Sequence, residues 1–340
     1  MSELSARVGR PPRVGFVVGN WLAPEEIGPT SRAVELATFD ELWLAEDSFY
    51  AGGIAAAASA LAATSDIPVA VGIFSCMVRH PALLAMELSA LGRAHPGRFR
   101  PGIGLGLTKF LMQMDLVPSS PLSAVRSVVR DVRQLLQGEI VSSTDGPFRL
   151  EGVRLAHDCR HSFLPIIVGG MGPRMLRLAG ELGDGVVLSV LAHSGYVEWA
   201  VAQIAAGARR STIAGRPEVT VFELFSVDED RDAARADAVN LLASFLGLLQ
   251  KTEMVGQLGL SDVVAQWCAE GSEGLMGHIT DSILDKFVVW GTPEDCAERI
   301  RRLAAAGGDA VALFPSQQAT AQSIRLAGQR LLPLLRTADD

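Results

Sequence analysis

The chain has 340 residues, of which 49% are hydrophobic and 20% are charged, and its formal net charge is −8. A chain of this length and apolar content can bury the core of one large α/β barrel or of two ordinary domains. The acidic balance and the scattered arginines argue against a nucleic-acid partner. The four cysteines lie far apart and form no CxxC pair, so we expect no metal site and no disulfide framework.

The sequence also gives no reason to expect a membrane partner. Residues 1–12 contain two arginines and two prolines but no apolar core of signal-peptide length. The longest alanine-rich run, residues 54–63, is too short to span a bilayer. We therefore expect a soluble, cytoplasmic protein with a flexible tail over residues 1–12.

From residue 13 onward, β-prone apolar runs alternate with segments of helical period. The predicted strands are residues 13–19, 41–46, 69–75, 99–104, 165–168, 185–189, 219–227 and 310–314. The predicted helices are residues 30–39, 53–64, 81–94, 121–137, 173–182, 194–213, 229–250 and 293–306. Such alternation requires a parallel sheet, and eight units close a barrel, so the predicted fold class is α/β, a (β/α)8 TIM barrel.

Two insertions interrupt the alternation. Residues 138–163 carry the turn Asp145-Gly146-Pro147 between β-prone runs, which predicts a hairpin excursion before the fifth strand. Residues 252–290 contain short helical segments, which predict a helical lid over the barrel mouth before the eighth strand. No linker or shift in composition marks a second domain, so we expect residues 13–340 to form a single domain.

The segment 164–189 has the pattern of a strand, a glycine turn, a helix and a second strand. Pro173 stands at the first helical position, where proline is favoured, and the glycines before it let a ligand approach the backbone closely. Free N–H groups of residues 170–174 can then converge on an anion, and Arg174 adds a positive charge. The turn therefore predicts a phosphate site, with an ordinary tight βα turn as the alternative.

In a βα barrel the functional groups follow the strands, because the carboxyl ends of the strands form the working face. The catalytic candidates follow the second predicted strand and are Glu46, Asp47 and Ser48. The two acids are candidates for delivering a proton, and Ser48 or Asn20 would position the substrate. The alternative is a solvated acid pair or a helix cap. The candidates for lining a substrate pocket are Asn20, Trp21, Phe74 and Lys109. The alternative for these side chains is packing in the core or a charge on the surface.

Four segments together resemble the bacterial luciferase-like superfamily of flavin and deazaflavin TIM-barrel enzymes: AEDSF, VAVGIFS with the RHPALLAMELSALGRAHPGRFRPGIGLG that follows, GGMGPRMLRLAGELGDGVVLS, and GTPEDCAERIRRLAAAGGDAVALFP. The similarity extends over residues 14–314. The GPRML turn and the GDGVVLS strand look more like the branch that resembles methylenetetrahydromethanopterin reductase, which uses the deazaflavin coenzyme F420, than like the FMN-dependent sulfonate and chelator monooxygenases.

The resemblance implies roles for residues at four strand ends. Gly72 and Ile73 would form a bulge under the central ring, often with a non-prolyl cis peptide. Gly104 and Gly106 would admit the ring edge or the ribityl chain, and Asp47 would lie near the ring's polar edge. The phosphate would be held by Gly169, Gly170, Met171, Gly172, Pro173 and Arg174.

The chain also departs from one deazaflavin branch, the sugar-phosphate dehydrogenases. That branch has a catalytic histidine directly after the aspartate and a glutamate after the fourth-strand glycines. This chain has Ser48 and Leu107 at those positions. Neither the substrate of that branch nor its acid–base assignment is therefore carried over.

These expectations combine into a predicted oxidoreductase that transfers a hydride between reduced coenzyme F420 and a small organic substrate with a C=N, C=C or C=O group. One alternative is an FMN-dependent luciferase-like monooxygenase that uses O2 and takes its reduced flavin from a partner flavin reductase. A second is a flavin-binding protein without catalysis. The resemblance also suggests a homodimer.

Overall fold

Eight parallel strands close into a barrel in the computed structural model, which describes residues 11–337. Each strand pairs with its neighbours in order, and the pairing of β9 with β8 closes the circle. All eight predicted strands and the (β/α)8 fold are confirmed. The strands are β1 (Arg13–Val18), β2 (Glu41–Leu44), β3 (Val69–Ser75), β4 (Phe99–Gly104), β7 (Ile167–Gly169), β8 (Gly185–Leu188), β9 (Glu218–Val227) and β11 (Ala310–Pro315).

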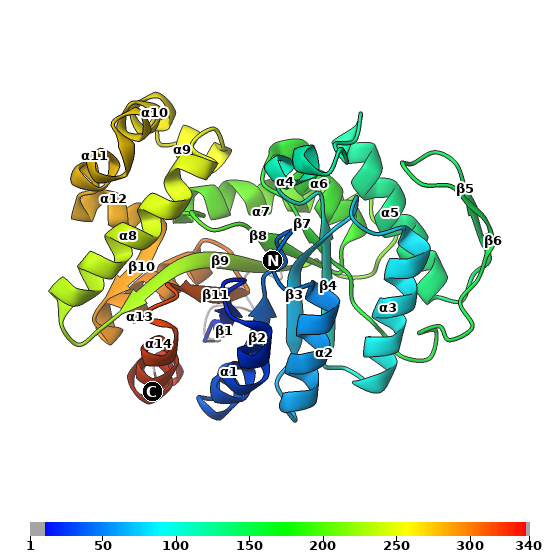
Figure 1. The fold of residues 1–340 in the computed structure, drawn as a ribbon, viewed down its shortest axis with the longest axis horizontal. Helices are drawn as coiled ribbons and strands as arrows, with labels where there is room; N and C mark the ends of the chain where they lie inside the picture. Colours follow the sequence, from blue (N-terminus) through cyan, green and yellow to red (C-terminus); the bar gives the residue numbers. More distant parts are fainter. Residues whose placement is uncertain (1–10, 338–340) are drawn as a thin grey trace, which may run out of the picture.

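Helices surround the barrel, as the alternation predicts (Figure 1). Proline occupies the first helical position of several of them, where its missing N–H removes no bond. The main helices are α1 (Pro24–Leu36), α2 (Gly53–Ala63), α3 (Pro81–Ala94), α5 (Pro121–Leu136), α6 (Pro173–Leu182), α7 (Ser194–Ala208), α8 (Arg231–Leu249) and α13 (Pro293–Ala305).

The first helix begins earlier than predicted. The helical period predicts a helix over residues 30–39. In the structure α1 begins at Pro24, and Pro29 lies within it. Glu25 and Glu26 occupy the first turn, where negative charge interacts favourably with the helix dipole.

The hairpin excursion is confirmed as β5 (Val141–Ser143) paired antiparallel with β6 (Leu150–Val153). The second insertion contributes α9 (Glu253–Gly256), α10 (Ser261–Ala269), α11 (Gly271–His278) and α12 (Asp281–Phe287). Figure 1 places the hairpin and these helices at opposite ends of the long axis.

The prediction that residues 252–290 are a purely helical insertion is wrong at its carboxyl end. Val288–Gly291 form a further strand, β10, which pairs in parallel with Leu224–Val227 of β9. Strand β8 pairs only with Glu218–Val221, so the second half of the long strand β9 has an edge that β8 does not cover. The apolar run Val288-Val289-Trp290 fills that edge.

Other helices were not predicted. The short helix α4 (Thr108–Gln113) follows β4, and the carboxyl-terminal segment forms α14 (Thr320–Leu326), the π-helical turn η2 (Ala327–Leu331) and α15 (Leu332–Arg336). Residues 1–10 of the predicted flexible tail lie outside the described residues. Within residues 11–337, no helix combines the length and the apolar character that crossing a membrane demands.

Candidate active site

Side chains from three strand ends meet at the mouth of the barrel. Asn20 follows β1 and Asp47 follows β2, and the Asn20 Nδ2 atom donates a hydrogen bond of 2.6 Å to Asp47 Oδ2. Lys109 in α4, after β4, is near enough to Asp47 to lower the pKa of its carboxyl group. Two residues predicted from separate parts of the sequence, Asn20 and Lys109, therefore lie close to Asp47.

The carboxyl group of Asp47 is suited to holding a proton. Burial raises its pKa above the ordinary value, while Lys109 and the hydrogen bond from Asn20 act in the opposite direction. Desolvation disfavours the charged form, so the acid form persists to higher pH than in a solvated aspartate. A partly buried acid beside an open mouth can deliver that proton to a bound substrate.

Glu46 has different surroundings, although it is adjacent in the chain. Its Oε1 atom accepts a 2.6 Å hydrogen bond from Arg79, whose guanidinium group also lies 3.5 Å from Glu87. Burial raises the pKa of Glu46, and the charge of Arg79 opposes that effect. Glu46 is thus held in an ion pair, whereas Asp47 is held by a neutral amide.

Of the remaining predicted residues near the acids, one is buried in the core and the others lie at the mouth of the barrel. Phe74 is fully buried beneath the Arg79 guanidinium, which corrects the expectation that its ring lines an open substrate pocket. Trp21 is partly buried, and its ring meets Phe314 edge to face at 4.9 Å. The side chain of Ser48 makes no hydrogen bond to any residue between 11 and 337.

The bulge expected in the third strand is present. The peptide bond between Gly72 and Ile73 is cis, and the register of β3 against β4 shifts between Val71 and Phe74. A Cβ atom at Gly72 would lie 2.8 Å from the ring of Phe222. Residue 72 must therefore be small because an aromatic side chain packs against it.

Two of the glycines expected to make room for a cofactor make room for Ile73 instead. A Cβ atom at Gly104 would lie 2.9 Å from Ile73 Cδ1, and one at Gly169 would lie 3.0 Å from Ile73 Cγ2. Gly106 has a different reason, since its φ of +84° belongs to the left-handed region that favours glycine. Packing and backbone conformation therefore account for these glycines without a ligand.

The start of α6 has the open character that a phosphate site needs. Gly172 is the N-cap residue, it supplies no side-chain cap, and the first turn contains no acidic residue. A Cβ atom at Gly172 would have no neighbour within 4 Å. Arg174 is exposed and forms no ion pair or hydrogen bond with another described residue. Uncapped N–H groups and a free guanidinium fit an anionic group here.

A tyrosine that the sequence did not predict supports this turn. Tyr196 of α7 is fully buried, and its hydroxyl donates a 2.6 Å hydrogen bond to the carbonyl oxygen of Met171. Burial raises the pKa of Tyr196, so the phenol keeps the proton that it donates. His193 accepts a hydrogen bond from the Tyr196 backbone N–H at 3.2 Å and caps the helix that carries the tyrosine.

Replacing Tyr196 by phenylalanine should loosen the turn while leaving the packing of the ring unchanged. The Met171 carbonyl loses its partner, and we expect the free energy of unfolding to fall by about 1 kcal/mol. Binding of a phosphate-bearing ligand should weaken by about three- to tenfold, as followed by fluorescence titration. Binding of the same ring compound without phosphate should not change, and an equal loss for both ligands would contradict the role of the turn.

A second buried group absent from the predictions is Glu223, in the middle of β9. It is 2% exposed, and burial raises the pKa of its carboxyl group well above the ordinary value. Side chains alternate along a strand, so it faces away from Phe222, toward the backbone N–H of Ala192. An acid within the apolar run VTVFELFSV is visible in the sequence, but it lies behind the strand rather than in the barrel interior.

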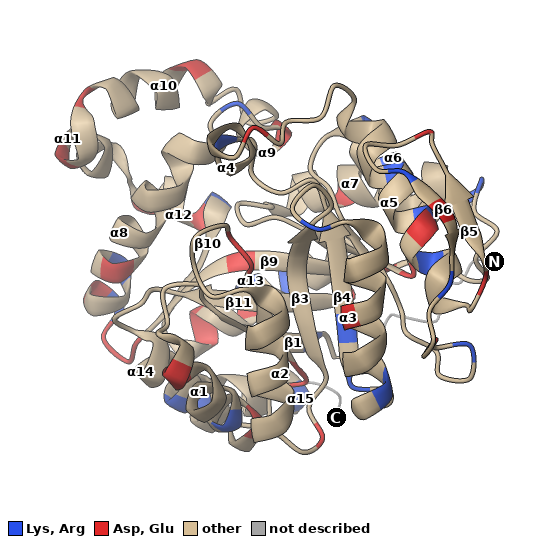
Figure 2. Cartoon of the chain, turned by 45° about the vertical axis from the view of Figure 1, so that its right-hand side comes forward, with Lys and Arg blue, Asp and Glu red and all other residues tan. Residues whose placement is uncertain are grey.

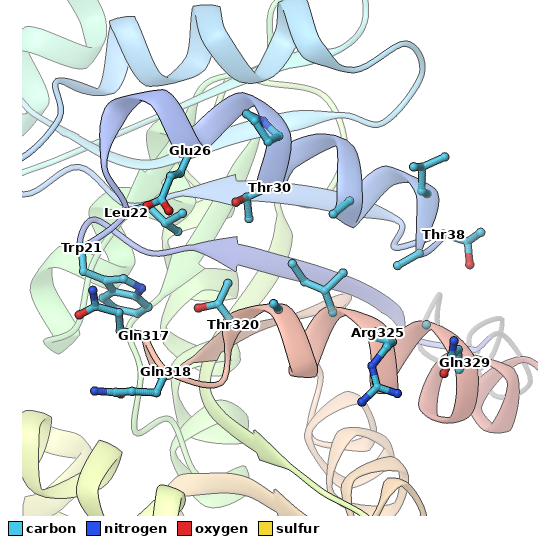
Figure 3. A pocket seen from close by; sticks show the side chains of 17 residues that line it. Trp21, Leu22, Glu26, Thr30, Thr38, Gln317, Gln318, Thr320, Arg325 and Gln329 are labelled. Carbon is cyan, nitrogen blue, oxygen red and sulfur yellow. The ribbon is translucent and has the colours of Figure 1, made fainter.

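A cleft of about 820 Å³ lies outside the barrel, between α1 and the carboxyl-terminal helices (Figure 3). Only the end at Trp21 and Gln317, on the left in Figure 3, approaches the carboxyl ends of β1 and β11. Glu26 and Arg325 lie further along the same groove. The cleft contains neither of the predicted acids nor the start of α6, and Trp21 is the one candidate site residue that lines it within the described part of the chain.

A comparison against protein families shows which family the chain belongs to. Residues 10–310 match the family model described as luciferase-like monooxygenase. The chain belongs to this family. The luciferase-like resemblance predicted from the four sequence segments is thereby confirmed.

Individual members of the luciferase-like monooxygenase family resemble the chain over most of its length. The 5,10-methylenetetrahydromethanopterin reductase of Archaeoglobus fulgidus is 31% identical over 267 residues, 75% of this chain and 79% of the relative. The F420-dependent glucose-6-phosphate dehydrogenase of Nakamurella multipartita is 23% identical over 92% of this chain and 93% of the relative. The structure of the coenzyme F420 dependent tetrahydromethanopterin reductase from Methanopyrus kandleri superposes with a TM-score of 0.80 at 22% identity, covering 96% of this chain and 100% of that chain.

Proposed function

We propose that this luciferase-like protein is an F420-dependent oxidoreductase that transfers a hydride between the reduced coenzyme and a small organic substrate with a C=N, C=C or C=O group. The named relatives support the coenzyme. The observation that carries the proposal is the uncapped start of α6, with free Arg174, in the same barrel as the Asn20–Asp47 pair. Together they supply an anion site and a proton-holding acid.

Each part of the site then has a task. The N–H groups of the α6 first turn and Arg174 hold the coenzyme phosphate, and Tyr196 fixes the turn from behind through Met171. The backbone of Gly72 and Ile73 supports the ring. When bound, the reduced deazaflavin supplies a hydride and does not activate oxygen usefully.

Asp47 supplies the proton that balances the hydride in the reductive direction. When the substrate is reduced, the proton held on the Asp47 carboxyl would pass to its heteroatom, or to the neighbouring carbon of a C=C group. Asn20 fixes the orientation of that carboxyl through its 2.6 Å hydrogen bond. In the oxidative direction Asp47 accepts the proton instead.

The choice of coenzyme is tested by titrating the purified protein anaerobically with F420 and with FMN, following the fluorescence of each. We expect F420 to bind at least about tenfold more tightly, a difference of about 1.4 kcal/mol. A preference for FMN, accompanied by oxygen consumption when the reduced flavin is supplied, would contradict the proposal and favour the monooxygenase alternative.

The expected homodimer remains part of the proposal. Leu83 and Met86 of α3 are 54% and 52% exposed, and Val78 just before that helix is 37% exposed. Apolar side chains gathered on one exposed face are typical of a surface that contacts another protein. We therefore infer that this face of α3 contributes to the contact between two copies of the chain.

A further inference from the structure

Four arginines on one side of the barrel lack carboxylate partners. Arg174, Arg209 and Arg210 form no ion pair with any residue between 11 and 337, and Arg177 donates only to the neutral side chain of Gln203, at 2.9 Å. All four are exposed. Most other arginines of the described chain pair with an aspartate or glutamate, among them Arg79, Arg126, Arg130, Arg133, Arg216 and Arg235.

These arginines form a continuous basic path that begins at the predicted phosphate site. Arg174 and Arg177 are three residues apart on α6, so their side chains are neighbours on one helix face. Arg177, Arg209 and Arg210 line a cleft of about 210 Å³ where the end of α7 crosses α6. The crossing is close because Gly207 lies directly on the backbone of Arg177. Figure 2 shows the basic positions on α6 at the side of the barrel.

One acidic residue, Glu181, also lines this cleft, and its charge is already compensated. Its two carboxylate oxygens accept hydrogen bonds of 2.5 and 2.9 Å from Arg126. This pairing, aided by the charge of Arg210, lowers the pKa of Glu181. The positive charges of Arg177, Arg209 and Arg210 therefore remain available, in a chain whose formal net charge is −8.

We propose that this cleft, which we name the arginine cleft (Arg177, Arg209 and Arg210), binds the carboxylate-bearing tail of the coenzyme beyond its phosphate. The inference rests on the proposed function, because it takes the phosphate at the start of α6 as its origin. The tail of F420 is a chain of glutamates, each with a free carboxylate. Guanidinium groups bind carboxylates through paired hydrogen bonds, and Arg174 bridges the phosphate and the cleft.

The test compares two forms of the coenzyme on two variants of equal charge. The cleft variant carries Arg177→Gln, Arg209→Gln and Arg210→Gln. The control variant carries three matched substitutions of exposed arginines elsewhere: Arg149→Gln, Arg154→Gln and Arg325→Gln. Affinity is measured by fluorescence titration for F420 with several glutamates and for the deazaflavin phosphate that lacks them, each at a series of salt concentrations.

We expect the cleft variant to bind the glutamate-bearing coenzyme about tenfold more weakly, because each exposed pair contributes up to about fivefold to an equilibrium constant. Its affinity should also depend less on salt. Binding of the tail-free compound should be unchanged in both variants, and the control variant should bind both compounds as the wild type does.

The two possible failures are distinguishable. Equal affinity of the cleft variant and the wild type for the glutamate-bearing coenzyme would overturn the tail site while leaving the phosphate site intact. An equal loss in the control variant would also overturn it, since the effect would then follow from net charge alone. Failure of the wild type to bind either deazaflavin compound would instead contradict the proposed function.

Discussion

Replacing Asp47 by asparagine should lower turnover by about 10²- to 10⁴-fold, the range that a positioned general acid contributes. The amide keeps the size of the side chain and its contact with Asn20 but cannot deliver a proton. Affinity for the coenzyme should change little. An anaerobic screen of imines, enones and ketones first identifies a substrate. The effect of the substitution is then measured as the rate at which this substrate oxidises the bound reduced coenzyme in a single turnover.

The Asp66→Asn variant is the matched control, because it makes the same acid-to-amide change at an exposed side chain that forms no hydrogen bond within residues 11–337. It should retain turnover within a few-fold of the wild type. Turnover of Asp47→Asn at the wild-type rate would remove Asp47 from proton delivery. An equal loss in both variants would indicate a general effect of the lost negative charge rather than a missing acid.

The pH dependence of the wild-type reduction rate tests the role of Asp47 independently of any substitution. Burial raises the pKa of Asp47, and the reductive direction needs the protonated form. The rate of reduction should therefore fall as pH rises through that raised pKa, above the ordinary value of 3.8. The Asp47→Asn variant should lack this limb of the pH profile.

Introducing a carboxylate at the start of α6 should abolish tight coenzyme binding without harming the fold. Gly172 has φ −92° and ψ 163°, which any residue adopts, and the space around its missing side chain is open. Aspartate is a favoured N-cap residue, so Gly172→Asp should leave the melting temperature unchanged or raise it. Beside a bound phosphate, however, its charge costs about 3 kcal/mol, or about 100-fold in affinity.

The Gly172→Ala variant separates charge from shape, because it adds a side chain with no charge and no capping group. We expect its affinity for the coenzyme to stay within a few-fold of the wild type in an equilibrium titration. Tight binding by Gly172→Asp, together with an unchanged or raised melting temperature, would show that no anion occupies the start of α6.

The barrel could be predicted from the sequence because the two patterns that indicate it, apolar strand runs and helical periods, are local. Apolar strand runs and helical periods depend on neighbouring residues, and the eight strands follow from them. Strand β10 is different, since its pairing with β9 depends on how far β9 extends past β8. The early start of α1 has local signals in Pro24, Glu25 and Glu26, but it also requires Pro29 to be tolerated inside the helix, which propensity alone does not favour.

In the candidate site, too, some features could be predicted from the sequence and others could not. Asp47, Asn20 and Lys109 could be brought together from the sequence because all three follow strands that end at one face of the barrel. The pairing of Glu46 with Arg79 was not predicted, although Arg79 also follows a strand, because the position of a strand end does not show which charged side chains will pair. Tyr196 was missed because a tyrosine in a helix gives no sign that its hydroxyl reaches Met171, 25 residues earlier.

The packing of the glycines could not be read from the sequence either. Gly104 was expected to admit the ring edge or the ribityl chain and Gly169 to hold the phosphate, yet the side chain of Ile73 occupies the space beside both. Which atoms fill the space next to a glycine depends on the bulge at residue 73, and that bulge depends on the register between β3 and β4.

The central claim is that one coenzyme connects the start of α6 to the Asp47 side of the mouth. A crystal structure of the protein with F420 tests it most directly. We predict density for the phosphate against the backbone N–H groups of Gly172 and Arg174 and for the ring beside Gly72, Ile73 and Asp47. Density for the coenzyme in the groove between α1 and α14, or a phosphate away from α6, would contradict the account.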